Sequence, residues 1–148
     1  MRGRCNDAVD VLLVADDDET SSRIEAEFDD IAVKTSVQVV SNGTEALRIL
    51  TDAATDSSAG PDLVLLDRDL SRTDGLELLE ALADEAVLGR RPVLVLARPG
   101  DSEAVRESYR LGANASLEKP TDAEGYTELV EAVAEFWFRR AALPVGDG

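Results

Sequence analysis

Charged side chains stand directly after several short apolar segments of this sequence. Asp16 follows the first of these segments, Asp67 and Asp69 follow the third, and Lys119 follows the fifth. Carboxylate oxygens gathered at one point suit Mg²⁺, which keeps several waters and takes one or two protein carboxylates. A lysine facing them can hold a phosphoryl oxygen. An aspartate beside such a metal can attack phosphorus and form an acyl phosphate.

The elements that must position these side chains alternate along the chain. Short apolar runs predict strands at 11–14, 37–40, 63–66, 93–96 and 115–118. Helical periodicity predicts helices that end near 31, cover 46–50, begin at 74–75, span 101–111 and run from 123 to about 140. Asn42 and Gly43 are interpreted as a turn, and 51–60 as a loop of small polar residues.

Five strand–helix units with buried strands predict a doubly wound α/β fold, with a parallel sheet covered by helices on both faces. In such folds, ligands bind at the carboxyl ends of the strands. The acids after the first and third strands and the lysine after the fifth are therefore expected to face one another.

Composition excludes several classes of protein. The 148 residues favour a single domain, and the absence of histidine excludes Ser-His-Asp and Cys-His nucleophiles. The single Cys5 excludes an intramolecular disulfide, which favours a reducing compartment. A formal charge of −16 argues against a nucleic-acid partner, and no apolar run approaches a membrane span. We expect a soluble cytoplasmic protein with no membrane partner.

The acidity supports a further hypothesis. There are 31 acidic residues against 15 basic ones, and only Lys34 and Lys119 among the latter are lysines. This composition is typical of proteins from a high-salt cytoplasm, where salt screens self-repulsion. The alternative is an ordinary acidic protein from a GC-rich genome.

Five segments in order and at matching spacing resemble the receiver domain of two-component response regulators over residues 9–144. They are VLLVADD at 11–17, PDLVLLDRDL at 61–70, DGLELL at 74–79, PVLVL at 92–96 and LGANASLEKP at 111–120. The resemblance implies a (βα)5 flavodoxin-like sandwich with strand order 2-1-3-4-5, and flexible tails at 1–8 and 145–148. The ending, which includes EFWF at 135–138, is similar to stand-alone receivers such as phytochrome-associated response regulators.

The resemblance also implies roles for individual residues. Asp67 would be the phospho-acceptor and Lys119 the phosphate-contacting lysine, with a cis bond before Pro120. Asp16 and Asp67 would bind Mg²⁺ through carboxylates, and Asp69 through its backbone carbonyl. The implied function is a single-domain response regulator, not an enzyme, that takes a phosphoryl group from a sensor histidine kinase. It would signal through contacts with a downstream protein.

Several of these residues have a simpler interpretation. The acids from Asp16 to Glu19 could serve only as an N-cap with an acidic first turn, which is our main interpretation of Asp17 and Asp18. Asp74 is likewise interpreted as an N-cap. The aromatic residues of the last helix, at 136–138, are expected to be part core and part exposed, and a homodimer through that helix is one possibility.

The chain departs from the receiver pattern at four positions. Ala15 replaces the first of two acids, Ala97 replaces a Thr or Ser, Ser116 replaces an aromatic residue, and Ser71 stands where Pro is common. These departures favour an alternative, a pseudo-receiver that binds proteins independently of phosphorylation. A third hypothesis is a haloacid-dehalogenase-like phosphatase, because of the Asp67-Arg-Asp69 motif. Chain order argues against it, since that family carries the motif at its first strand.

Overall fold

One parallel sheet forms the centre of the molecule. The computed structural model describes residues 9–31, 34–54, 61–68, 79–80 and 92–140. Its strands are β1 (Val9–Val14), β2 (Thr35–Val40), β3 (Leu63–Asp67), β4 (Val93–Ala97) and β5 (Ala115–Glu118). They pair in parallel in the order β2-β1-β3-β4-β5, which confirms the expected sheet.

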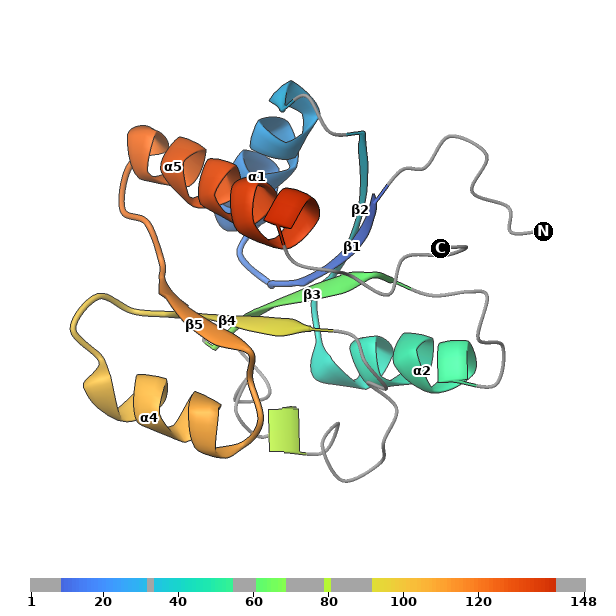
Figure 1. Ribbon diagram of the computed structural model, residues 1–148. Helices are drawn as coiled ribbons and strands as arrows, with labels where there is room; N and C mark the ends of the chain where they lie inside the picture. Colours follow the sequence, from blue (N-terminus) through green and yellow to red (C-terminus); the bar gives the residue numbers. More distant parts are fainter. Residues whose placement is uncertain (1–8, 32–33, 55–60, 69–78, 81–91, 141–148) are drawn as a thin grey trace.

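Helices cover both faces of this sheet. They are α1 (Asp18–Asp30), α2 (Gly43–Ala54), α4 (Ser102–Arg110) and α5 (Ala123–Val133), and α5 continues into the π-helical segment η1 (Ala134–Arg140). Helices α1 and α5 lie on one face, and α2 and α4 lie on the other (Figure 1). The three layers are those of the predicted doubly wound fold.

The two faces of the sheet carry two separate apolar clusters, because successive side chains of a strand point to opposite sides. All residues of β3 and β4 are buried. On the α1 and α5 side the cluster includes Leu13, Leu65, Leu94 and, from the helices, Ile24 and Phe28. The cluster on the other side includes Leu12, Val14, Leu50, Val64, Leu66 and Val95. The central strands are therefore apolar on both faces, as parallel strands must be.

Aspartates begin three of the helices. Asp17 caps α1, Asp101 caps α4 and Asp122 caps α5, and each carboxylate accepts a hydrogen bond from a backbone N–H of the first turn. Such a bond satisfies one of the donors that a helix start leaves without an intrahelical partner. Each of these helices begins a few residues after the end of a strand: α1 follows β1, α4 follows β4 and α5 follows β5. Because the strands are parallel, the first turns of the three helices lie at the same edge of the sheet.

Two sequence-based predictions around α2 are wrong. Asn42 does not form a turn with Gly43, because its Oδ1 accepts a hydrogen bond from the Glu45 N–H at 2.8 Å at the start of the helix. The helix also continues to Ala54 through part of the predicted loop. Buried Leu50 holds this last part on the sheet, and the alanines beyond it favour helix.

No helix within the described ranges has the length and hydrophobicity needed to cross a membrane.

Candidate functional site

A buried carboxylate and a lysine meet at the carboxyl edge of the sheet. Asp67 ends β3, and its side chain is 0% exposed. Lys119 follows β5, and its Nζ donates a hydrogen bond to Asp67 Oδ2 at 2.8 Å. The Lys119 backbone N–H also donates to the Ala97 carbonyl at 2.7 Å, which fixes the start of the segment that carries the ammonium. The two side chains that sequence reasoning assigned to one edge are in direct contact.

The electrostatics of this contact keep Lys119 charged. Burial alone would lower the pKa of the Lys119 ammonium, but its hydrogen bond to Asp67 and the negative charge of that carboxylate outweigh the effect and raise the pKa. Tyr126 and Asp17 also raise the pKa of Lys119. At neutral pH the site therefore holds a cation against a carboxylate.

Asp16 lies at the same edge, at the end of the neighbouring strand. Val14 of β1 pairs with Leu66 of β3, so the residues that follow both strands leave the sheet at one level. Asp16 is partly buried there. Within the described ranges no group of three or more Asp, Glu, His or Cys could hold a metal ion. Asp69, the third predicted metal contact, lies outside the described residues. Asp16 and Asp67 each carry carboxylate oxygens, the type of ligand that suits Mg²⁺.

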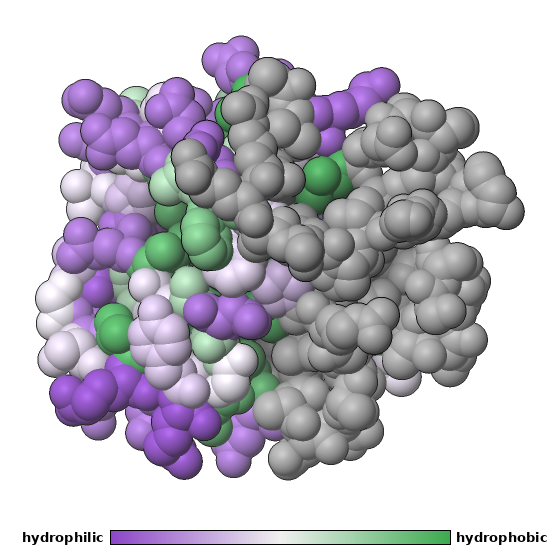
Figure 2. Space-filling view, in the orientation of Figure 1, coloured by the Kyte–Doolittle hydropathy of each residue, from purple (hydrophilic) through white to green (hydrophobic). Residues whose placement is uncertain are grey.

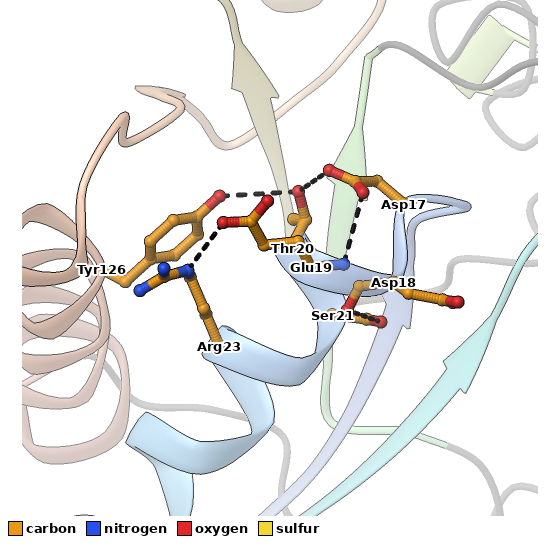
Figure 3. Close-up of polar contacts among 7 residues, drawn as sticks. All are labelled: Asp17, Asp18, Glu19, Thr20, Ser21, Arg23 and Tyr126. Carbon is orange, nitrogen blue, oxygen red and sulfur yellow. Dashed lines mark hydrogen bonds and ion pairs between the residues drawn. The ribbon is translucent and has the colours of Figure 1, made fainter.

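Asp17 and Thr20 form the start of α1. Thr20 is buried and its Oγ1 donates a hydrogen bond to Asp17 Oδ2 at 2.7 Å, while the Glu19 N–H donates to Oδ1 at 3.3 Å (Figure 3). The Thr20 hydrogen bond is the largest of the effects that lower the pKa of Asp17. These contacts confirm the N-cap interpretation of Asp17.

Tyr126 of α5 joins this cluster from the other helix. Its hydroxyl donates to Thr20 Oγ1 at 3.5 Å, so a hydrogen-bonded chain runs from Tyr126 through Thr20 to Asp17. The Arg23 guanidinium lies 5.8 Å from the centre of the Tyr126 ring and pairs with Glu19 (Figure 3). Neither Thr20 nor Tyr126 was found by sequence reasoning. The only signal in the sequence for Thr20 is its position, because it carries a hydroxyl three residues after the N-cap Asp17.

A second cation directly follows Asp67 in the sequence. It is Arg68, and its Nε is 3.9 Å from Asp101 Oδ2 in the loop between β4 and α4. Both side chains are 29% exposed. The sequence places Arg68 after the third strand, in the middle of an Asp-x-Asp motif, but it does not predict the ion pair, which depends on a loop more than thirty residues away.

The departures Ala97 and Ser116 leave small side chains between β4, β5 and α4. Ala97 is buried, and the partly buried Ser116 lies 3.5 Å from the hydroxyl of Ser108 on α4. A pocket of about 300 Å³ opens here, lined among others by Ala97, Val105 and Ser116. Figure 2 shows one face of the molecule. Hydrophilic residues mark the upper and lower edges of its described part, and hydrophobic surface shows between them.

Other predicted features have mixed outcomes. Ser71 and Asp74 lie outside the described residues. The prediction of a cis bond before Pro120 is wrong, because no peptide bond among the described residues is cis. The trans form is lower in energy even before proline.

The aromatic residues of η1 are partly exposed and partly buried. Phe136 is 52% exposed, whereas Trp137 is partly buried and packs against the core. That mixture was expected, although the Phe138 side chain lies outside the description.

Comparison with known proteins identifies the family. The model of the family described as response regulator receiver domain matches residues 11–133. The chain belongs to the response regulator receiver family. The receiver architecture, the sheet order and the place in two-component signalling follow from this membership together with the observed fold.

Individual relatives resemble the whole described receiver domain. Response regulator Rcp1 of Synechocystis sp. is 29% identical over 140 residues, which cover 90% of this chain and 92% of that protein. The crystal structure of the Mn²⁺-bound form of Rcp1 matches with a TM-score of 0.81 at 27% identity, covering 93% of this chain and 99% of that one. The phosphorylated cyanobacterial phytochrome response regulator RcpA matches with the same TM-score, 0.81, at 28% identity and the same coverage, 93% and 99%.

Proposed function

We propose that this receiver is a single-domain response regulator that accepts a phosphoryl group on Asp67 from a sensor histidine kinase. The observation that carries the proposal is the hydrogen bond from Lys119 to the fully buried Asp67 carboxylate, at the edge where parallel sheets bind ligands. The receiver would act by contact with a downstream protein rather than by catalysing a reaction of its own. Its place of action would be the cytoplasm.

Phosphoryl transfer to Asp67 would require the protein to position the reacting groups and to supply positive charge. A carboxylate oxygen of Asp67 attacks phosphorus, the bond between phosphorus and the kinase imidazole nitrogen breaks, and the electron pair leaves with the imidazole. The Lys119 ammonium is placed to contact an oxygen of the transferred group. This contact would compensate negative charge that develops during transfer.

A divalent cation fits the acidic side of this site. Asp16 and Asp67 would hold Mg²⁺, together with the backbone carbonyl of Asp69. When bound, Mg²⁺ supplies positive charge to the phosphoryl oxygens. The similar Rcp1 has been solved in a Mn²⁺-bound form, which supports a divalent cation in this receiver.

A second candidate function is a pseudo-receiver, a protein-binding module that does not use phosphorylation. The buried Ala15 and Ala97 favour it, because methyl groups stand where a second carboxylate and a hydroxyl are expected. Exposed Phe136 on η1 offers an apolar contact for a protein partner or a second copy of the chain. The intact pair of Asp67 and Lys119 argues for the first candidate.

Phosphoryl labelling separates the two candidates. We expect phosphoramidate to add one phosphoryl group to the wild-type protein in the presence of Mg²⁺ and none in its absence. Intact-mass spectrometry should show the addition abolished in Asp67→Asn. The matched control is Asp62→Asn. Asp62 is also a buried aspartate, but its carboxylate accepts a hydrogen bond from the backbone N–H of Asp10 in β1. Labelling of Asp67→Asn equal to wild type would reject Asp67, and an unlabelled wild type would favour the pseudo-receiver.

A further inference from the structure

Two loops at the phospho-acceptor edge are joined by an ion pair. The Arg68 backbone N–H donates to the Leu96 carbonyl at 3.0 Å, which anchors the residue after Asp67 to β4. Its Nε lies 3.9 Å from Asp101 Oδ2. Arg68 is thus fixed by its backbone beside Asp67, while its guanidinium faces the loop after β4.

Asp101 has two roles at once. Its Oδ1 accepts a hydrogen bond from the Ala104 N–H at 3.1 Å and caps α4, while its Oδ2 faces Arg68. The Asp101 backbone N–H donates to the Arg98 carbonyl at 3.1 Å. The Arg68 contact can therefore be exchanged without loss of the cap, because the two contacts use different oxygens.

Phosphorylation would change the charge balance beside Arg68. An acyl phosphate on Asp67 carries more negative charge than the carboxylate it replaces and presents three strong acceptor oxygens. Ala97 offers no hydroxyl to these oxygens. Lys119 is a point charge already engaged at one side, whereas a guanidinium can donate two parallel hydrogen bonds to a phosphoryl group.

We propose that Arg68 is a second phosphoryl-binding cation, which Asp101 holds until Asp67 is modified. The inference rests on the proposed function. Phosphoryl oxygens compete with Asp101 for the guanidinium, and Asp101 keeps only its cap contact in the phosphorylated form. The pocket of about 300 Å³ lined by Asp101, Ser102, Val105 and Ser116 gives the first turn of α4 room to adjust. The response stays close to Arg68, Asp101 and that turn.

Beryllofluoride, a tetrahedral phosphoryl mimic, tests the exchange in the presence of Mg²⁺. Arg68→Gln should weaken its binding about tenfold, the size of one charge-assisted hydrogen bond in a partly screened site. Asp101→Asn should tighten binding about threefold, because asparagine keeps the N-cap but releases Arg68. In the double variant the affinity should equal that of Arg68→Gln alone, since Asp101 acts only through Arg68.

Glu107→Gln is the matched control. Glu107 is also on α4, but it pairs with Arg110 at 2.8 Å. Its substitution removes one negative charge without releasing Arg68 and should leave the affinity within about twofold of wild type, as for a screened surface charge.

The outcomes separate the inference from the proposed function. A wild type that binds no beryllofluoride overturns both. A wild type that binds, with binding abolished in Asp67→Asn but unchanged in Arg68→Gln, overturns the role of Arg68 alone. Equal tightening by Asp101→Asn with and without Arg68 would show an effect of overall charge and would also overturn it. The Arg68 Nε–H resonance, followed by NMR, should shift when beryllofluoride is added to wild type and to Glu107→Gln.

Discussion

At the scale of single residues, the buried Asp67 carboxylate determines what its neighbours must be. A charged group out of water is costly unless it is paired and hydrogen-bonded. Lys119 provides both the charge and the hydrogen bond from a segment 52 residues away. The pair belongs to a site rather than to a core, because the Lys119 side chain remains 19% exposed and its ammonium lies where a ligand can reach it.

Removing the lysine should therefore cost stability. Lys119→Met should lower the free energy of unfolding by about 2 kcal/mol, because a buried acceptor loses its charged donor. In an Asp67→Asn background the same substitution should cost much less, since the neutral amide needs no counter-charge. Urea unfolding of the four proteins measures the coupling. An equal loss in both backgrounds would attribute the effect to packing of the lysine stem.

The pH dependence of this contribution has a definite sign. Because folding raises the pKa of Lys119 above its ordinary 10.5, the stabilisation is complete at neutral pH. It is lost as pH rises through the raised pKa. The difference in stability between wild type and Lys119→Met should therefore be constant between about pH 6 and 9 and shrink only in strongly alkaline solution.

At the scale of elements, the start of α1 is tied both to its own cap and to α5. The Thr20 hydroxyl accepts from Tyr126 and donates to Asp17, so one buried side chain joins two helices at the functional edge. Such chains of hydrogen bonds polarise one another in a low-dielectric setting. They place α5, which begins just after Lys119, against the first turn that follows Asp16.

Thr20→Val tests this junction with little change in volume. The pKa of Asp17 should rise towards its ordinary 3.8, because the largest stabilising contact of the carboxylate is lost. A carboxylate whose pKa is lowered by folding contributes stability above its ordinary pKa, and the contribution disappears as pH falls through the folded pKa. The variant should therefore lose less stability than wild type between about pH 5 and 2. NMR titration of the Asp17 carboxyl carbon measures the shift directly.

Ser21→Ala is the control for that experiment. Ser21 is the next buried hydroxyl of the same helix, but it donates to the Asp18 carbonyl rather than to Asp17. The pKa of Asp17 should not change in this variant. A shift of equal size in both variants would mean that the first turn has unfolded, not that one hydrogen bond was lost.

At the scale of the whole molecule, net charge is the dominant feature. A formal charge of −16 on 148 residues repels itself across a small surface, and it acts on all elements at once. Salt shortens the range of this repulsion from about 10 Å at 0.1 M to about 3 Å at 1 M. Stability should consequently depend on ionic strength more than any single ion pair would suggest.

Thermal unfolding should reveal this dependence. We expect Tm to rise with KCl from about 0.1 M, with most of the increase below about 1 M, where screening changes most. Sucrose serves as the comparison, because it strengthens apolar burial without screening charge. A Tm that is flat in KCl would reject the high-salt interpretation of the composition and favour an ordinary acidic protein.

Local features were decided by the sequence alone. Apolar segments predict the strands of a parallel sheet, and the acids after the first strand predict the cap that begins α1. Because the carboxyl ends of parallel strands share one edge, the contact between Asp67 and Lys119 also follows from pattern. These inferences succeed because periodicity and capping depend on neighbours a few residues away.

Only the tertiary structure decided which side chains complete the edge. Tyr126 reaches Thr20 across 106 residues, and Arg68 faces Asp101 from another loop. The continuation of α2 to Ala54 likewise depends on burial of Leu50 against the sheet. Contacts of this kind arise when helices pack on a twisted sheet. The packing determines which side chains of different elements meet, and the local sequence pattern of each element does not contain this information.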